Sequence, residues 1–403
     1  MKGYLSRHVA LSLREDLSIF RVLVLTGARQ VGKTTLALNE EPFKYWTYLS
    51  LDDWETLELA EKAPSEIFAL GKDLIIDEVQ KAPKLLSYVK IFNDREPERR
   101  FLLTGSSHLL LMKEVTESLA GRAAYRELLP LTLSELYQHP LPSWLLTPEK
   151  LENLKKSPFE EDILWLLFRG FLPPLLRLTK PKQVFSWWQG YVRTYLERDL
   201  RDLAHITHLP DYRRLMRLLA LRTGGILKIS DLARDLALPQ TTVSRYIHLL
   251  ETSCLLIRLP AFTNNLAKRV IKSPKIYFLD PGLASHLMDK RDLKDLSREE
   301  QAKLFENLVF QNLYVFSELE GGRLYYFRTY GGREKEVDFV LEIAGSVIGV
   351  EVKFKKEVGF KDVENLRFFR KVTPTFQAGF VIYLGNRLQK LGENLYAVPW
   401  WWF

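Results

Sequence analysis

Hydrophobic and polar positions follow several different periods along the 403-residue chain, and each period predicts a different kind of element. In the first part of the chain, short apolar runs predict strands at residues 22–25, 73–77 and 101–104, and residues 124–129 are strand-like. The first of these runs is followed by a glycine-rich loop and the start of a helix. The N-terminal part is therefore predicted to be an α/β unit.

Helical spacing replaces the apolar runs in the middle of the chain. Residues 212–222 are amphipathic, and two further helices are expected at residues 229–237 and 240–251. Short strands at residues 256–259 and 275–278 follow as a plausible β-ribbon. This is the order of elements in a winged helix-turn-helix.

Alternation with a period of two marks the C-terminal third and predicts a β-hairpin. If its turn centres between Ala344 and Gly345, Asp338 lies opposite Glu351 with the Cβ atoms about 5 Å apart. Lys353 lies on the same face. Two carboxylates in that position repel each other unless a positive charge lies between them, either Mg²⁺ or the lysine. The opposite face is expected to hold Val337, Phe339, Val350 and Val352.

A glycine-rich segment directly after the first predicted strand carries the most specific chemistry. Residues 27–34 have the form of a phosphate-binding loop between a strand and a helix. Backbone N–H groups and the helix N-terminus favour a triphosphate there, Lys33 adds a full positive charge, and the Thr34 hydroxyl can bind Mg²⁺. The expected nucleotide-binding residues are Gly27, Ala28, Arg29, Gln30, Val31, Gly32, Lys33, Thr34 and Thr35.

Two acids, Asp77 and Glu78, end the apolar strand that begins at Asp73. An aspartate in this position can hold Mg²⁺ through water, and the adjacent glutamate can polarise a water for attack on the γ-phosphate. The alternative is a buried strand that runs into a solvated acidic turn. Thr104 and Ser106 end the next strand, where their hydroxyls can contact the γ-phosphate or the attacking water.

With these segments in place, the chain resembles the AAA+ ATPases, and among them the prokaryotic branch in which the ATPase module precedes a C-terminal domain of unassigned function. The resemblance implies a parallel-sheet P-loop domain with ATP and Mg²⁺ as its ligands. It also implies that the usual nucleotide roles belong to Lys33, Thr34, Asp77 and Glu78. No guanine-reading motif follows the loop, so ATP is favoured over GTP.

The same resemblance assigns further residues of the ATPase site. Thr104 or Ser106 would be the sensor on the central strand. Arg122 would be an arginine finger that reaches the γ-phosphate of a neighbouring subunit, which requires a homo-oligomer. Arg126 lies close by, and an arginine that enters a strand is often a solvated edge residue, so both alternatives stay open.

Length and composition bound the class of protein. A chain of 403 residues with 46% hydrophobic and 27% charged residues is expected to form two or three globular domains. No apolar run approaches the ~18 residues of a membrane span, and the N-terminus lacks the apolar core of a signal peptide. Cys254 is the single cysteine, which favours a buried thiol and a reducing, cytoplasmic location.

The net charge of +8 is concentrated in one segment, because residues 191–275 hold 15 Lys and Arg against 7 Asp and Glu. Such a surplus is typical of a nucleic-acid footprint, although solvated helices also carry arginine freely. In the second helix of the predicted helix-turn-helix, the outward side chains able to reach DNA are Thr241, Thr242, Ser244 and Arg245. Winged helices also serve as protein-docking modules, so a protein partner is the alternative.

Asp338, followed by Glu351 and Lys353 on the next strand, resembles the core motif of the PD-(D/E)XK nuclease fold, although no proline precedes Asp338. The resemblance implies that the two acids bind Mg²⁺ and that the lysine orients the attacking hydroxide. It also implies that Glu306, on a preceding helix, is a further metal ligand. The alternative is a salt-bridged hairpin in a fold that keeps the motif without cutting DNA.

These interpretations predict four parts with different folds. They are an AAA+ P-loop ATPase core at 1–140, a helical lid or connector at 141–208, a winged helix-turn-helix at 209–280 and a PD-(D/E)XK-like α/β domain at 281–403. The leading hypothesis is an ATP-hydrolysing protein that couples nucleotide state to DNA binding, with Mg²⁺-dependent cleavage as a further option. The competing hypothesis is a nucleotide-gated protein-interaction switch with an inactive nuclease-like domain.

Overall fold

The computed structural model describes residues 3–105, 119–153, 161–196, 208–263, 269, 272–329 and 334–403. The chain forms two compact units, one of Met1–Leu131 with Thr252–Leu255 and one of Thr132–Glu251 with Leu256–Phe403. The finer division at residues 140, 208 and 280 stays a prediction.

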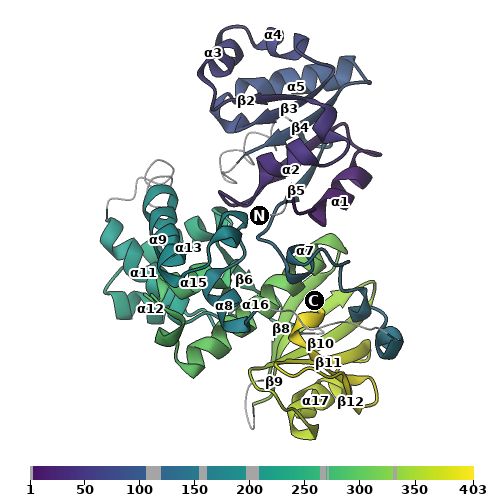
Figure 1. The fold of residues 1–403 in the computed structure, drawn as a ribbon, viewed down its shortest axis with the longest axis vertical. Helices are drawn as coiled ribbons and strands as arrows, with labels where there is room; N and C mark the ends of the chain where they lie inside the picture. The colour runs from purple at the N-terminus through teal and green to yellow at the C-terminus, as the bar shows by residue number, and fades with distance from the viewer. Residues whose placement is uncertain are drawn as a thin grey trace. The chain divides into compact units, whose positions relative to one another are not determined.

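The first unit is a sheet covered by helices (Figure 1). Its five described strands are all parallel, in the order β2-β3-β4-β1-β5. The strands are β1 (Val22–Thr26), β2 (Thr47–Ser50), β3 (Asp73–Asp77), β4 (Arg100–Thr104) and β5 (Ala123–Glu127). The helices are α1 (Val9–Asp16), α2 (Lys33–Asn39), α3 (Trp54–Lys62), α4 (Pro64–Ala69) and α5 (Lys84–Arg95).

The central strands β1, β3 and β4 are buried along nearly their whole length. Helices on both faces of a parallel sheet require such unbroken apolar runs, which explains why these strands do not alternate in sequence. On one face, Val24 and Ile76 lie in a cluster with Phe68 of α4 and Leu86 of α5. Because the strands are parallel, their carboxyl ends meet at one edge, and the phosphate-binding loop begins at that edge.

The second unit begins with helices and a β-ribbon. The helices are α7 (Leu133–Leu136), α8 (Ile163–Arg169), α9 (Pro181–Tyr191), α11 (Leu209–Leu221), α12 (Ile229–Leu236) and α13 (Gln240–Thr252). Strands β6 (Leu256–Leu259) and β7 (Lys275–Phe278) then form an antiparallel pair, and α15 (Pro281–Leu287) packs against α8, α9 and α11. Of these elements, α11, α12, α13, β6 and β7 lie where the hydrophobic pattern predicts them. No helix in the described ranges is long and apolar enough to cross a membrane.

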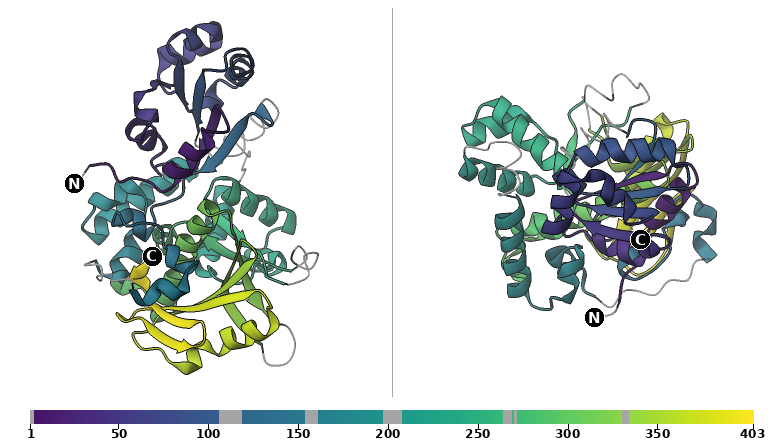
Figure 2. Two further views of the ribbon diagram at one scale, coloured as in Figure 1. Left: turned by 90° about the vertical axis from the view of Figure 1, so that its right-hand side faces the viewer. Right: turned by 90° about the horizontal axis from the view of Figure 1, so that it is seen from above.

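A six-stranded sheet forms the C-terminal part of this unit, and Figure 2 shows its strands side by side in green to yellow. Its described order is β12-β13-β11-β10-β9-β8, in which β10, β11 and β13 run parallel to one another. The strands are β8 (Arg323–Arg328), β9 (Glu336–Ile343), β10 (Ser346–Lys353), β11 (Phe376–Tyr383), β12 (Gln389–Gly392) and β13 (Leu395–Pro399). Two helices cover it, α16 (Arg298–Leu319) and α17 (Glu364–Val372).

Helix α16 joins the two parts of the second unit, because it contacts α8, α15 and β7 as well as β8, β9 and β10. Its Asn307 is fully buried. The Asn307 Oδ1 accepts hydrogen bonds from the Thr223 hydroxyl at 2.7 Å and the Phe278 N–H at 3.1 Å. Its Nδ2 donates to the Phe278 carbonyl at 2.7 Å. Since a buried amide without partners is costly, these bonds fix β7 against α16.

The hairpin of β9 and β10 has the register predicted from the sequence. Its last ladder pair joins Val350 with Phe339, so Asp338 and Glu351 come directly after it. The ladder does not continue through them, because the Val352 N–H donates to Oδ2 of Asp338 at 2.8 Å. The Asp338 side chain thus takes the place of the next backbone acceptor.

The other side of β9 contains an irregularity that the sequence did not predict. Phe327 pairs with Val337 and Tyr325 with Val340, which leaves one extra residue in β9, a β-bulge beside Asp338. The bulge reverses the expected alternation. Val337 was expected on the same face as Phe339, but it packs in the apolar cluster under α17.

Candidate functional site

The phosphate-binding loop follows β1 and ends where α2 begins at Lys33. Gly27 has a φ of 139° and Gly32 a φ of 103°, values that favour glycine. A Cβ atom on Gly27 would also collide with the carbonyl oxygen of Leu128. The two glycines therefore permit the tight turn on which the sequence motif depends. Of the remaining loop residues, Ala28 and Val31 are buried, Arg29 is half-buried, and Gln30 and Thr35 are exposed.

The Lys33 side chain folds back over this loop. Its Nζ donates hydrogen bonds to the carbonyl oxygens of Gly27 at 2.9 Å and Ala28 at 3.1 Å. Burial lowers the pKa of Lys33, whereas the nearby charge of Glu78 raises it. A phosphate oxygen is a stronger partner for an ammonium than a neutral carbonyl, so a bound triphosphate can take over this side chain.

The Asp77 carboxylate lies at the carboxyl edge of the sheet and accepts four hydrogen bonds. Its Oδ2 accepts from the Thr34 hydroxyl at 2.7 Å and the Tyr48 hydroxyl at 2.8 Å. Its Oδ1 accepts from the Thr104 hydroxyl and, at 3.1 Å, from the Glu78 N–H. Asp77 is 4% exposed, and all four donors are neutral.

The sequence predicted three of these groups and missed one. Thr34, Asp77 and Thr104 come together as expected, whereas Ser106 lies outside the described residues. Tyr48 was missed because a tyrosine in a short strand is typical of any β-sheet and carries no motif. Glu78 has a left-handed φ of 56°, and its carboxylate accepts a hydrogen bond from the Gln80 amide.

Arg122 lies at the other edge of the sheet. It directly precedes β5, which is parallel to β1, so it is at the amino end and away from the loop of its own chain. Its guanidinium pairs with Asp94 through Nε–Oδ1 at 2.8 Å and Nη2–Oδ2 at 3.0 Å. Arg126 pairs similarly with Asp16, at 2.6 and 2.9 Å. A role for Arg122 at a nucleotide would require another subunit.

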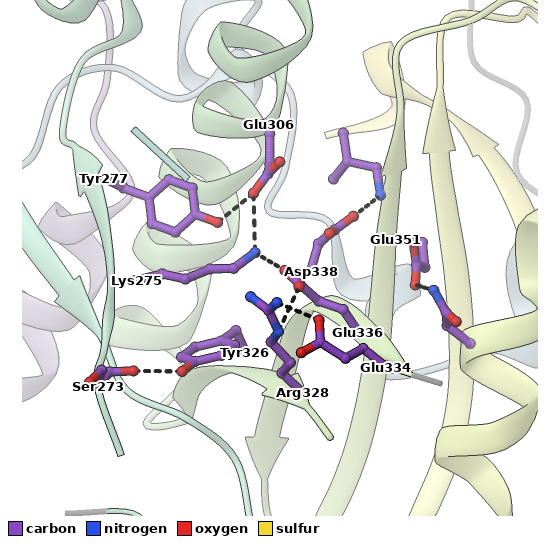
Figure 3. Close-up of polar contacts among 12 residues, drawn as sticks. Ser273, Lys275, Tyr277, Glu306, Tyr326, Arg328, Glu334, Glu336, Asp338 and Glu351 are labelled. Carbon is purple, nitrogen blue, oxygen red and sulfur yellow. Dashed lines mark hydrogen bonds and ion pairs between the residues drawn. The ribbon is translucent and has the colours of Figure 1, made fainter. Parts of the chain in front are cut away.

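The second candidate site lies where β7, α16 and β9 meet in the second unit (Figure 3). Lys275 lies between two acids, with its Nζ 3.6 Å from Oε1 of Glu306 and 2.5 Å from Oε1 of Glu336. The Tyr277 hydroxyl donates to the same Glu306 oxygen at 2.5 Å. Burial raises the pKa of Glu306 to about 7, against the lowering effect of Lys275. Lys275 itself is only 4% exposed at its side chain.

Asp338 lies between this group and Glu351 in Figure 3. Glu351 is 2% exposed, and its Oε2 accepts a hydrogen bond from Nζ of Lys353 at 2.6 Å. The Asn365 amide of α17 donates to the other oxygen at 3.2 Å. Burial and the charge of Asp338 raise the pKa of Glu351 to about 8.

The metal site predicted from Glu306, Asp338 and Glu351 is not assembled in this arrangement. In the part of the chain that the structure describes, no three His, Cys, Asp or Glu side chains lie close enough together to hold a metal ion. The sequence left Mg²⁺ or a lysine as the compensating charge, and the structure contains lysines, Lys275 beside Glu306 and Lys353 beside Glu351. Lys275 was missed because a lysine at the start of a strand is usually a solvated strand end.

The residues predicted to contact DNA lie along α13. Thr241 and Arg245 are exposed one turn apart on the helix, and Thr242 and Ser244 are half-buried. The Arg245 guanidinium lies over the ring of Tyr246, 5.5 Å from its centroid. Arg245 therefore keeps its charged group at the surface, above an apolar support.

Family comparisons define the class of the first unit. Residues 20–137 match a family described as "AAA domain", which spans the loop, Asp77 and Arg122. Residues 160–308 and 301–403 match two families described as domains of unknown function, DUF8612 and DUF4143. The protein thus joins an AAA-type domain to two domains of unassigned function.

Relatives of similar length define the family of the whole chain. The uncharacterized protein Rv2008c of Mycobacterium tuberculosis is 30% identical over 398 residues, which cover 98% of this chain and 83% of the relative. The uncharacterized protein MJ1544 of Methanocaldococcus jannaschii is 24% identical over 338 residues, 80% of this chain and 72% of the relative. The chain belongs to the same family as the mycobacterial protein.

Among solved structures, the Walker-type ATPase PABY2304 of Pyrococcus abyssi is 19% identical with a TM-score of 0.47, covering 70% of this chain and 96% of that chain.

Proposed function

We propose that the first unit binds ATP with Mg²⁺ and hydrolyses it. The observation that carries the proposal is the 2.7 Å hydrogen bond between the Thr34 hydroxyl and the Asp77 carboxylate, beside a glycine-rich loop with a lysine. Both groups offer the hard oxygen ligands that Mg²⁺ prefers, and the ion usually takes its other ligands from water and phosphate. The match to the AAA domain supports the same function.

Each residue of the loop region has a distinct task in this proposal. Lys33 leaves the carbonyls of Gly27 and Ala28 and neutralises the β- and γ-phosphates. Glu78 polarises the attacking water, and the Gln80 amide holds its carboxylate in place. Mg²⁺ would supply electrostatic stabilisation of the phosphate oxygens.

The test is steady-state ATP hydrolysis by the full chain with Mg²⁺. Lys33→Ala and Glu78→Gln are each expected to lower kcat/KM at least about a hundredfold, and Glu78→Gln is expected to keep ATP binding. Lys62→Ala is the matched control, since Lys62 is an exposed lysine paired with Glu58 on α3. Hydrolysis that survives both substitutions would overturn the proposal.

We further propose that α11–α13 and the ribbon β6–β7 act as a winged helix that contacts DNA through α13. The exposed face with Thr241 and Arg245 supports this, as does the positive surplus of residues 191–275. Arg245→Ala is expected to weaken binding of duplex DNA and to lower the slope of log K against log salt by about one. If Arg245→Ala left the affinity for DNA unchanged and DNA did not stimulate ATP hydrolysis, a protein partner would be favoured instead.

For the C-terminal domain, we propose a PD-(D/E)XK-like arrangement in which Asp338, Glu351 and Lys353 form the reactive group. The hydrogen bond from Lys353 to Glu351 supports it, and the alternative is an inactive fold within a protein-interaction switch. Cleavage of single- and double-stranded DNA with Mg²⁺ or Mn²⁺, with and without ATP, distinguishes the two. Cutting by the wild type that disappears in Asp338→Ala is the expected result.

An arginine-finger role for Arg122 is proposed only for a homo-oligomer. The phosphate of a neighbouring subunit would have to replace Asp94 as its partner. Specific activity that rises with protein concentration and falls in Arg122→Ala is the expected result. An equal fall in Arg126→Ala would point to a structural effect.

A further inference from the structure

Tyr48 forms a hydrogen bond that no nucleotide-binding motif explains. It lies on β2, the edge strand beside β3, and its hydroxyl is 2.8 Å from Oδ2 of Asp77. The Thr34 hydroxyl donates to the same oxygen at 2.7 Å. One carboxylate oxygen thus receives two hydroxyl donors, and only one of them belongs to the phosphate-binding loop.

The two oxygens of Asp77 are not held in the same way. Oδ1 is fixed by the hydroxyl of Thr104, at the end of β4, and by the N–H of Glu78, which directly follows β3. Oδ2 faces the loop, where Thr34 has a second task because its hydroxyl oxygen must bind the ion. Among the described contacts of Oδ2, Tyr48 is the donor outside the loop. It can therefore hold the carboxylate in place when the Thr34 hydroxyl oxygen binds Mg²⁺.

From this geometry we infer that Tyr48 is a positioning residue, which orients the Asp77 carboxylate toward Mg²⁺ during ATP hydrolysis. The inference rests on the proposed ATPase function. It assigns a task to the edge strand β2, outside the residues of the known motif. A neutral donor suits this task, because it orients the carboxylate and leaves the negative charge that attracts the ion.

Tyr48→Phe tests the inference, because it removes the hydroxyl and keeps the ring. One hydrogen bond contributes about 0.5–1.5 kcal/mol, so the Mg²⁺ concentration for half-maximal hydrolysis is expected to rise about 2- to 10-fold. ATP affinity in EDTA is expected to stay unchanged. The matched control is Tyr45→Phe, since the Tyr45 hydroxyl bonds Glu41 on a side chain that is 74% exposed.

A second measurement does not depend on hydrolysis, so it also applies to a variant that binds nucleotide but hydrolyses ATP slowly. Titration of a fluorescent ADP analogue with and without Mg²⁺ gives the metal dependence directly, and thermal unfolding shows that each variant is folded. An unchanged or lowered Mg²⁺ requirement in a folded Tyr48→Phe would overturn the inference and leave ATP hydrolysis standing. A wild type that hydrolyses no ATP, with no difference from Lys33→Ala, would overturn the proposed function and the inference with it.

Discussion

The two candidate sites both place a buried acid at the end of a strand, but they give it different partners. Asp77 accepts hydrogen bonds only from hydroxyls and a backbone N–H in the contacts described. In the second unit, Lys275 lies against Glu306 and Lys353 against Glu351. The first acid is oriented without being neutralised, whereas the second group carries its own counter-charges.

This difference decides which site is ready for a cation. The neutral donors leave the Asp77 carboxylate without a direct ion pair in the contacts described, so in the proposed function its charge is available to the Mg²⁺ that accompanies the nucleotide. At the C-terminal site a metal ion would have to displace an ammonium from a buried acid, which costs the energy of that ion pair. The proposed DNA cleavage therefore requires a rearrangement of Lys275 or Lys353, whereas the proposed ATP hydrolysis requires that Lys33 turn toward phosphate and that the Thr34 hydroxyl oxygen bind the ion.

The largest expected effect comes from removing the buried lysine. Lys275→Met leaves Glu306 and Glu336 without their shared cation, and breaking a buried pair in this way costs about 3–5 kcal/mol of unfolding free energy. Urea unfolding measures the loss. Lys303→Met, which breaks a surface pair with Glu299 on the same helix α16, should change stability by less than about 1 kcal/mol. Equal losses for the two variants would contradict the view that Lys275 neutralises the buried acids Glu306 and Glu336.

The next effect concerns charge at the first site. Asp77→Asn keeps the size of the side chain and removes the charge, so ATP hydrolysis should fall at least about a hundredfold, or about 2.7 kcal/mol. Asp73→Asn is the matched control, because Asp73 begins the same strand β3 at its other end and accepts the Arg100 N–H. If Asp77→Asn retained full activity with Mg²⁺, the charge of Asp77 would have no role in metal binding.

Sequence reasoning reached the first site because its geometry is mostly local. The spacing of Gly27 and Gly32 sets the loop, and an apolar strand that ends at Asp77 must meet that loop at the same edge of a parallel sheet. The partner Tyr48 was beyond reach, since it comes from an edge strand whose place in the sheet no local pattern specifies. Sheet order is a property of the whole unit.

The C-terminal site shows the same limit more strongly. The hairpin register followed from alternation, but the end of the ladder at Val350 and Phe339, one pair before Asp338 and Glu351, was not predicted. The bulge in β9 was not, because it depends on how β8 pairs along the other side. Lys275 comes from a separate ribbon that α16 brings to the acids through Asn307. Each of these features depends on contacts between segments that are distant in the sequence.

The smallest expected effect, counted per pH unit, is the change of folding stability with pH that Glu351 causes. Its pKa is raised to about 8 in the folded chain, against about 4.3 for an unfolded glutamate. The folded state therefore holds a proton that the unfolded state has released, and its stability falls as pH rises between these two values, by up to about 1.4 kcal/mol per pH unit. Glu351→Gln resembles the protonated acid and lacks this loss.

Urea unfolding of the wild type and of Glu351→Gln at about pH 5, 6.5 and 8 measures the free energy of unfolding of each as a function of pH. As pH rises, the free energy of unfolding of the variant minus that of the wild type should increase. Because the substitution also changes the contact with Lys353, the trend with pH carries the result, and the value at one pH does not. A difference that stays constant, or that shrinks toward pH 8, would mean that Glu351 is ionised and fully balanced by Lys353, and that the site is a plain ion pair.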